Sequence, residues 1–246
     1  MRRFGCLCVT AIFSSAAVTT GTGLPSEVAG RLESMVSLAE TDDFVGSYHM
    51  NLSSVVQKPN GKARKESLIE AEIVNDGDGA SRRRLLKFIE DGSNVTEEKR
   101  AKFEGEDGDR QNDDGDEDDD TDLASPFGDT ADHYRFGAPE TRGSMVVMPF
   151  EPAPGHEDDE DIARGMIAWD GESLEPQWLE MEALHPPKPL KELRMRLEFD
   201  RIDGEVFMSR LVTDGLAKIL LLTREFHMDL RFDDIRPASK HGDRSD

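Results

Sequence analysis

Apolar and polar residues alternate along most of the chain beyond residue 44, as in strands with one buried face. The clearest run is Leu193 to Asp200, where Leu193, Met195, Leu197 and Phe199 alternate with charged residues. The period recurs over residues 48–56, 69–73, 86–88, 145–150, 164–170, 177–184, 206–213 and 226–233. The pattern predicts about ten β-strands.

Short turn sequences separate these segments. Asn60-Gly61 follows a proline, residues 75–79 read Asn-Asp-Gly-Asp-Gly, and Asp-Gly pairs occur at 91–92, 203–204 and 214–215. Asn-Gly and Asp-Gly accept positive φ angles and suit tight hairpins. Neighbouring strands therefore pair in antiparallel order, and βαβ units are not expected.

One helix is expected before the strands. Pro25 and Ser26 are start signals, and apolar residues follow at helical spacing at Val28, Leu32, Met35, Val36 and Ala39. The predicted fold is therefore mainly β (α+β): a curved antiparallel half-barrel sheet of about ten strands covered by an N-terminal helix. A single helix cannot cover so large a sheet, so the apolar face must pack on itself, meet a partner or enclose a ligand.

The N-terminus, residues 1–20, is typical of a bacterial signal peptide. Arg2 and Arg3 precede an apolar stretch over 4–18, and Ser15-Ala16-Ala17 fits a cleavage site. We expect a cleaved leader and a periplasmic location; an uncleaved anchor and a misassigned start codon are the alternatives. Both cysteines, Cys6 and Cys8, lie in the leader, so the mature chain would have no thiol chemistry, unless one of them is a lipoprotein acylation site.

Acidic residues dominate the charge of the chain. The formal net charge is −22, which excludes nucleic acid as a partner and opposes anionic lipid headgroups. Much of it lies in an insertion at about residues 104–126, which we expect to be disordered, as is a flexible tail at 238–246. The insertion matches no EF-hand loop, although weak binding of divalent cations stays open.

No motif for catalysis or metal binding is present. The 6 histidines form no HxH, HxxxH or HExxH pattern, and there is no G-x-S-x-G, P-loop or G-x-G-x-x-G. We therefore expect a non-enzymatic protein with no cofactor and no metal site. A catalytic triad assembled from distant residues is the alternative, because triads are defined by geometry.

The order of segments over about residues 24–237 resembles the LolA/LolB-like periplasmic outer-membrane lipoprotein-sorting superfamily. The likeness rests on residues 43–48, the turn at 59–62, the segment Gly165-Met166-Ile167-Ala168-Trp169-Asp170, and Phe232-Asp233-Asp234-Ile235-Arg236. The resemblance implies a helix-capped half-barrel whose apolar concave face holds acyl chains.

The function expected from these observations is a periplasmic lipid- or lipoprotein-binding carrier. The candidate pocket-lining residues are Trp169, Trp178, Met195, Leu197 and Phe199. Lipid or lipoprotein acyl chains are the expected ligands, with transient contact to a membrane or membrane protein. The alternative is an interaction module whose acidic loops, the insertion and a second loop over residues 152–161, dock a basic partner. The sequence does not specify the oligomeric state.

Overall fold

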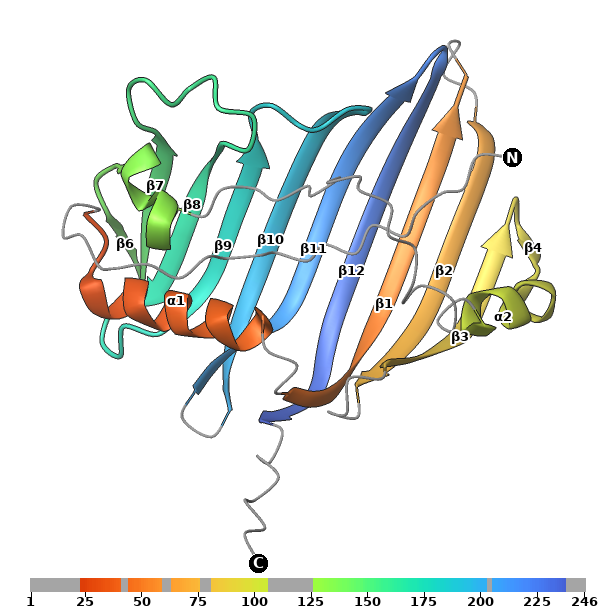
Figure 1. Ribbon diagram of the computed structural model, residues 1–246, viewed down its shortest axis with the longest axis horizontal. Helices are drawn as coiled ribbons and strands as arrows, with labels where there is room; N and C mark the ends of the chain where they lie inside the picture. The colour runs from red at the N-terminus through yellow and green to blue at the C-terminus, as the bar shows by residue number, and fades with distance from the viewer. Residues whose placement is uncertain are drawn as a thin grey trace, which may run out of the picture.

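The chain forms one open antiparallel β-sheet with helices on one side (Figure 1). The computed structural model describes residues 23–40, 44–58, 63–75, 81–105, 126–202 and 205–237. The 12-stranded sheet has the strand order β4-β3-β2-β1-β12-β11-β10-β9-β8-β7-β5, and β6 pairs with β7. Strand β12 therefore joins the N-terminal hairpins to the rest of the sheet.

The long strands make up most of the sheet, and short strands lie near its two ends. The strands are β1 (Phe44–Gln57), β2 (Ala63–Asn75), β3 (Ser81–Glu90), β4 (Ser93–Asn94), β5 (Tyr134–Phe136), β6 (Glu140–Arg142), β7 (Met145–Pro152), β8 (Ala163–Asp170), β9 (Pro176–Ala183), β10 (Leu190–Ile202), β11 (Glu205–Ile219) and β12 (Leu222–Pro237).

Helix α1 (Ser26–Glu40) lies across the sheet and contacts β9 and β11, whereas α2 (Thr96–Gly105) packs against β3 (Figure 1). A 3-10 helix, η2 (Gly128–His133), leads into β5. At the start of α2, the Asn94 side chain accepts a hydrogen bond from the Thr96 amide at 3.0 Å.

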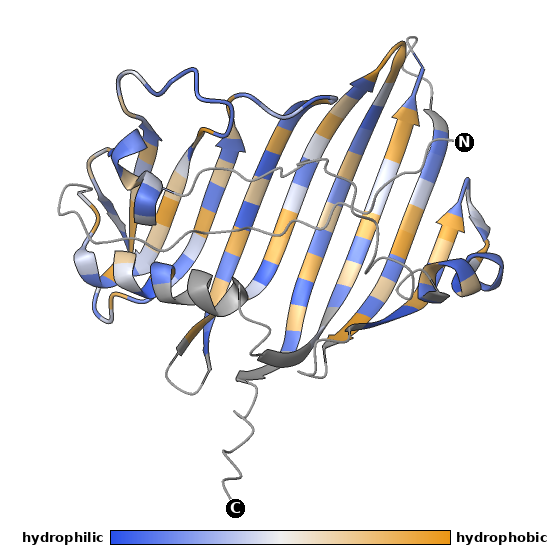
Figure 2. Cartoon of the chain, viewed as in Figure 1, coloured by the Kyte–Doolittle hydropathy of each residue, from blue (hydrophilic) through white to orange (hydrophobic). Residues whose placement is uncertain are grey.

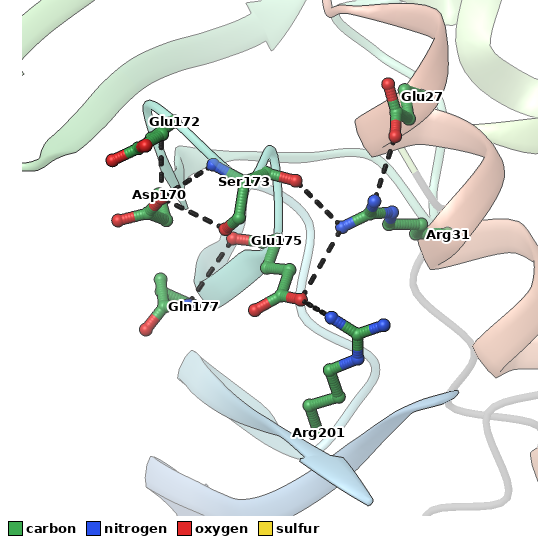
Figure 3. Close-up of polar contacts among 8 residues, drawn as sticks. All are labelled: Glu27, Arg31, Asp170, Glu172, Ser173, Glu175, Gln177 and Arg201. Atoms are coloured by element: carbon green, nitrogen blue, oxygen red, sulfur yellow. Dashed lines mark hydrogen bonds and ion pairs between the residues drawn. The ribbon is translucent and has the colours of Figure 1, made fainter. Parts of the chain in front are cut away.

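Polar contacts attach α1 to the β8–β9 turn (Figure 3). Arg31 donates hydrogen bonds to the carbonyl oxygen of Ser173 at 3.0 Å and to Glu27 at 2.8 Å. Glu175 accepts a hydrogen bond from Arg201 on β10. The turn itself is closed by Asp170, whose carboxylate accepts hydrogen bonds from two amides and the hydroxyl of Ser173; these bonds, chiefly those from Ser173, lower the pKa of Asp170.

The two faces of the sheet differ in chemistry, as the alternating colours along each strand show (Figure 2). The face beneath α1 is apolar and is called the inner face below. The outer face carries ion pairs between neighbouring strands. Glu182 accepts hydrogen bonds from Arg164 and Arg194, and Asp229 accepts two from Arg210.

The expected fold class is confirmed: the protein is mainly β with an antiparallel, open sheet. The N-terminal helix predicted from residue 26 is also present. The predicted turn at Asp214-Gly215 is wrong, because β11 continues through both residues to Ile219. Helix α2 is an element that the sequence did not predict, and the sheet gains short strands that were not expected.

Other predictions lie outside the described residues. They are the signal peptide at 1–20, most of the acidic insertion, the tail at 238–246, and the turns at 59–61, 76–79 and 203–204. Among the described helices, none has the length and apolar character needed to cross a membrane.

Candidate functional site

A continuous band of apolar side chains crosses the inner face from β7 to β3. Residues paired across adjacent antiparallel strands point to the same face. The strand registers align one row of such residues: Met148, Ile167, Leu179, Leu197, Leu211, Leu230, Met50, Ala71 and Leu85.

A second row runs beside the first. It consists of Phe150, Gly165, Met181, Met195, Thr213, Met228, Leu52, Ile69 and Phe88. Together the rows form the feature called the apolar band below. Thr213 is its one side-chain hydroxyl, and its Oγ1 is buried without a hydrogen-bond partner among the described residues.

Helix α1 closes one end of the apolar band. Val28 and Leu32 are fully buried against a cluster that includes Ile167, Leu179 and Leu197. This part of the inner face is filled by the protein's own side chains, so it is a core and not a cavity.

The middle of the band, on β12, β1 and β2, is packed differently. Met50, Ala71, Ile73 and Met228 form a separate small cluster. Leu52, Ile69 and Leu230 are only half-buried beside it, and Phe103 of α2 reaches it from the other end. Within the described part of the chain, neither α1 nor α2 lies across β12, β1 and β2 (Figure 1).

The inner face becomes polar toward the β11–β12 hairpin. Ser54 pairs with Phe226 on β12 and Ser67 on β2, and the two serine hydroxyls are 2.9 Å apart. In the next pair along, Arg224 donates a hydrogen bond to Ser54 Oγ at 3.2 Å, and burial lowers the pKa of its guanidinium. A cationic group therefore lies beside the apolar band on the same face.

Beyond Arg224, the hairpin that joins β11 to β12 ends in exposed apolar side chains. Leu220 is 89% exposed, Leu221 76% and Ile219 42%. Leu220 has a φ angle of 56°, a left-handed conformation that favours glycine or asparagine. An exposed leucine in this conformation is disfavoured both by solvation and by its backbone.

Lysines surround this hairpin tip, which stands out in a strongly acidic chain. Lys218 precedes the tip and is exposed, and its amide donates a hydrogen bond to Pro189. This bond brings the exposed Lys188 and Lys191 to the same edge of the sheet. Lys58 follows Gln57, which pairs with Thr223.

The structure separates the residues that sequence reasoning grouped as pocket-lining. Trp169, Met195, Leu197 and Phe199 belong to the buried cluster beneath α1. Trp178 is half-buried on the outer face, where the Arg196 guanidinium lies 4.7 Å from its ring centroid. The sequence analysis named no residue of β12, β1 or β2 as pocket-lining, although the alternation of apolar and polar residues predicted these strands.

A hollow of about 650 Å³ lies on the outer face and is lined by Arg164, Glu180, Glu182, Arg194 and Arg196, among others. These side chains pair with one another across β8, β9 and β10. Because its charges are matched internally, this hollow is a less suitable site for an amphiphile than the inner face.

Comparisons with known proteins yield structural neighbours only. No family model and no curated protein matches the chain. A DUF1329 family protein from Desulfovibrio piger is 10% identical, with a TM-score of 0.33, over 91% of this chain and 96% of its own. A domain from Vibrio parahaemolyticus described as an outer membrane lipoprotein-sorting protein is 11% identical, with a TM-score of 0.31, over 89% and 95%.

A third neighbour is the MucA/MucB complex of Pseudomonas aeruginosa. Its matched chain is 11% identical, with a TM-score of 0.20, and the match covers 87% of this chain and 99% of that one. The sequence identities and TM-scores of these neighbours are all low. The function below is therefore derived from this chain's own residues.

Proposed function

We propose that this protein is a non-enzymatic carrier that binds acyl chains, of lipids or lipoproteins, on the apolar band. The observation that carries the proposal is the middle of the band on β12, β1 and β2. There, Leu52, Ile69 and Leu230 stay half-buried between the two ends covered by α1 and α2. A sheet with a polar outer face is stabilised when such an apolar surface is covered.

The energetics favour an acyl chain as the occupant. Burying a methylene group contributes about 0.8 kcal/mol, so a sixteen-carbon chain would contribute up to about 12 kcal/mol before ordering costs are subtracted. The methionines of the band, Met50 and Met228, suit a ligand of variable shape because their side chains are flexible and polarizable. Leu197 and Leu211 continue the band from β12 toward α1 and would bound the site on that side.

The polarity of the inner face suggests an orientation for the ligand. Arg224, Ser54 and Ser67 lie between the apolar band and the β11–β12 hairpin. A carboxylate or phosphate headgroup would lie near Arg224, with its tail along Met228, Leu52 and Ile69. A half-buried guanidinium forms strong charge-assisted hydrogen bonds with such oxyanions.

The hairpin tip would provide the contact with a membrane that a carrier needs. Leu220 and Leu221 can enter the interfacial region of a bilayer while Lys218 and its neighbours meet lipid phosphates. Sequence reasoning expected the acidic surface to oppose anionic headgroups. The local concentration of lysines at this edge would allow the approach in spite of the net charge.

Titration with a fluorescent long-chain fatty acid tests the carrier function. We expect saturable binding to the wild-type protein and at least tenfold weaker binding to Leu52→Glu, since a buried carboxylate is costly beside an acyl chain. Ser53→Glu adds the same charge to the outer face of the same strand and should bind as the wild type does.

A second variant protects the test against misfolding. Ile69→Trp fills the middle of the band without adding charge and should also reduce binding. Circular dichroism verifies that each variant is folded. Wild-type protein that binds no fatty acid, or variants in this region that bind like the wild type while folded, would contradict the proposal.

A further inference from the structure

Two histidines and an aspartate from separate segments meet at the end of the sheet next to η2. His133 ends η2, whereas His156 and Asp159 lie in the connection between β7 and β8. One ligand atom from each residue lies within 4.8 Å of the other two. We propose that these residues form a binding site for a divalent transition-metal ion of the zinc type.

The contacts within the cluster bring the donor atoms toward a common point. Asp159 Oδ2 lies 2.8 Å from His156 Nδ1 and 3.6 Å from His133 Nδ1. The two imidazole rings stack with their centroids 4.0 Å apart and an interplanar angle of 18°. In this form the carboxylate interacts with both rings; an ion coordinated by all three would require the rings to turn so that their nitrogen lone pairs converge.

The burial of the side chains allows this adjustment. His133, His156 and Asp159 have side chains that are about one-third exposed, so they can rotate without disturbing the core. The backbone around them is fixed. The Ala153 amide donates to the His133 carbonyl at 2.7 Å, and the His156 amide donates to the Ala153 carbonyl at 3.0 Å.

Surrounding groups support binding of a cation. Asp132 lies 3.8 Å from the other ring nitrogen, His133 Nε2, and adds a negative charge beside the imidazole. His185 Nε2 is 2.7 Å from the Glu157 carbonyl and holds the loop to the β9–β10 connection. The loop sequence Glu157-Asp158-Asp159-Glu160-Asp161 adds a negative potential that attracts cations.

The donor set selects the class of metal. Two imidazole nitrogens and one carboxylate oxygen suit Zn²⁺ and its neighbours, whereas Ca²⁺ and Mg²⁺ prefer sites made only of oxygen. Three protein ligands leave a fourth tetrahedral position for water. An ion bound by the three side chains would cross-link η2 to the β7–β8 connection. It would thereby stabilise the adjacent end of the core, which includes Phe127, Tyr134 and Ile162.

Cobalt titration of tag-free, chelator-treated protein tests the site. Co²⁺ replaces Zn²⁺ and reports its coordination by its visible absorption. Excess Mg²⁺ is included to occupy exposed carboxylates. We expect one Co²⁺ to bind per chain and to give the intense visible absorption band of a tetrahedral site. Addition of Zn²⁺ should remove this band. His156→Ala and His133→Ala should each weaken binding at least about tenfold.

The chain provides a matched control at His227. This histidine also pairs with a carboxylate, since its Nδ1 lies 2.8 Å from Asp214 Oδ1. Among the described residues, however, His227 belongs to no group of three side chains that could hold a metal ion. His227→Ala should therefore bind Co²⁺ like the wild type. Zn²⁺ should also raise the thermal unfolding temperature of the wild type and of His227→Ala, but not that of His156→Ala.

Two results would overturn the proposal. One is tetrahedral Co²⁺ binding that persists in the His133→Ala/His156→Ala double variant. The other is the absence of a tetrahedral band in the wild-type protein, with only weak binding that Mg²⁺ removes.

Discussion

The phenyl ring of Phe226 lies over the backbone of Gly215 on the adjacent strand. A Cβ atom at position 215 would be 2.1 Å from Cζ of this ring. The two residues pair directly in the β11–β12 register, so the ring occupies the space that a side chain at 215 would fill. Only glycine leaves room for the ring at position 215. This explains why an Asp-Gly pair, which is typical of turns, occurs inside a long strand.

Substitution of Gly215 should therefore destabilise the sheet. Gly215→Ala forces Phe226 out of its position, and overpacking of this kind costs about 1–3 kcal/mol. Gly30→Ala is a control with the opposite sign, because nothing lies within 4 Å of a Cβ there and alanine favours the helix by about 0.5–1 kcal/mol. Urea unfolding of both variants measures the two effects. Equal stability of Gly215→Ala and the wild type would contradict the packing described.

Helix α1 should be held mainly by its apolar residues and only weakly by its ion pairs. Leu32 is fully buried, so Leu32→Ala should reduce the free energy of unfolding by about 2–5 kcal/mol. Arg31→Gln removes the contact to Ser173 at the surface and should cost about 1 kcal/mol or less. Thermal or denaturant unfolding compares them; a larger loss for Arg31→Gln would reverse this ranking.

The pair formed by Asp229 and Arg210 should make stability depend on acid pH. The hydrogen bonds from Arg210, with a smaller contribution from Arg231, hold the pKa of Asp229 below its ordinary value. The pair's contribution is therefore complete above the unfolded pKa of about 4 and is lost as the pH falls through the lower, folded value.

Asp229→Asn measures this contribution. We expect a loss of about 1–3 kcal/mol at neutral pH that diminishes below pH ~4. Urea unfolding across this range follows the difference, with Asp200→Asn at an exposed position of β10 as a control. A difference that stays constant down to strong acid would show that the carboxylate charge is not responsible.

The hairpin tip should bind membranes through its leucines. Leu220→Ser combined with Leu221→Ser should reduce co-sedimentation with vesicles of phosphatidylcholine and phosphatidylglycerol severalfold, since each buried methylene contributes about 0.8 kcal/mol. Leu86, 39% exposed on β3, provides the control Leu86→Ser. If the double variant sediments like the wild type, the tip is not the membrane contact.

The protein should be more stable when Leu220 at this tip is replaced by glycine. Leu220→Gly relieves a φ angle of 56° and should raise the free energy of unfolding by up to about 1 kcal/mol while weakening vesicle binding. Such opposite effects on stability and binding are expected where a residue is kept for its function. A variant that loses stability would indicate instead that Leu220 packs within the fold.

Local periodicity explains which parts of the fold were predictable. The strand from Leu193 to Asp200 and the helix from Ser26 both follow from residues close together in sequence. Helix α2 was missed because its only large apolar residue is Phe103, so it has no apolar stripe to recognise. The turn predicted at Asp214-Gly215 is wrong because both residues pair with β12 on one side and β10 on the other, and this pairing outweighs their local preference for a turn.

The candidate sites depend on register, which the sequence specifies only indirectly. His133 and His156 come together because Tyr134 pairs with Pro152 in the β5–β7 ladder. Trp178 and Trp169 were grouped by residue type, yet the alternation of β9 places Trp178 on the face opposite Leu179. The apolar band likewise exists only after Met50, Leu52 and Ile69 are aligned across strands from both halves of the chain.

Photo-cross-linking with a diazirine analogue of palmitic acid tests the carrier function most directly, because it reports both binding and location. The account predicts light-dependent adducts on peptides of β12, β1 and β2 that contain Leu230, Leu52 and Ile69, and unlabelled palmitate should suppress them. Adducts concentrated on outer-face residues such as Arg164 and Glu182, or labelling that palmitate does not reduce, would contradict it.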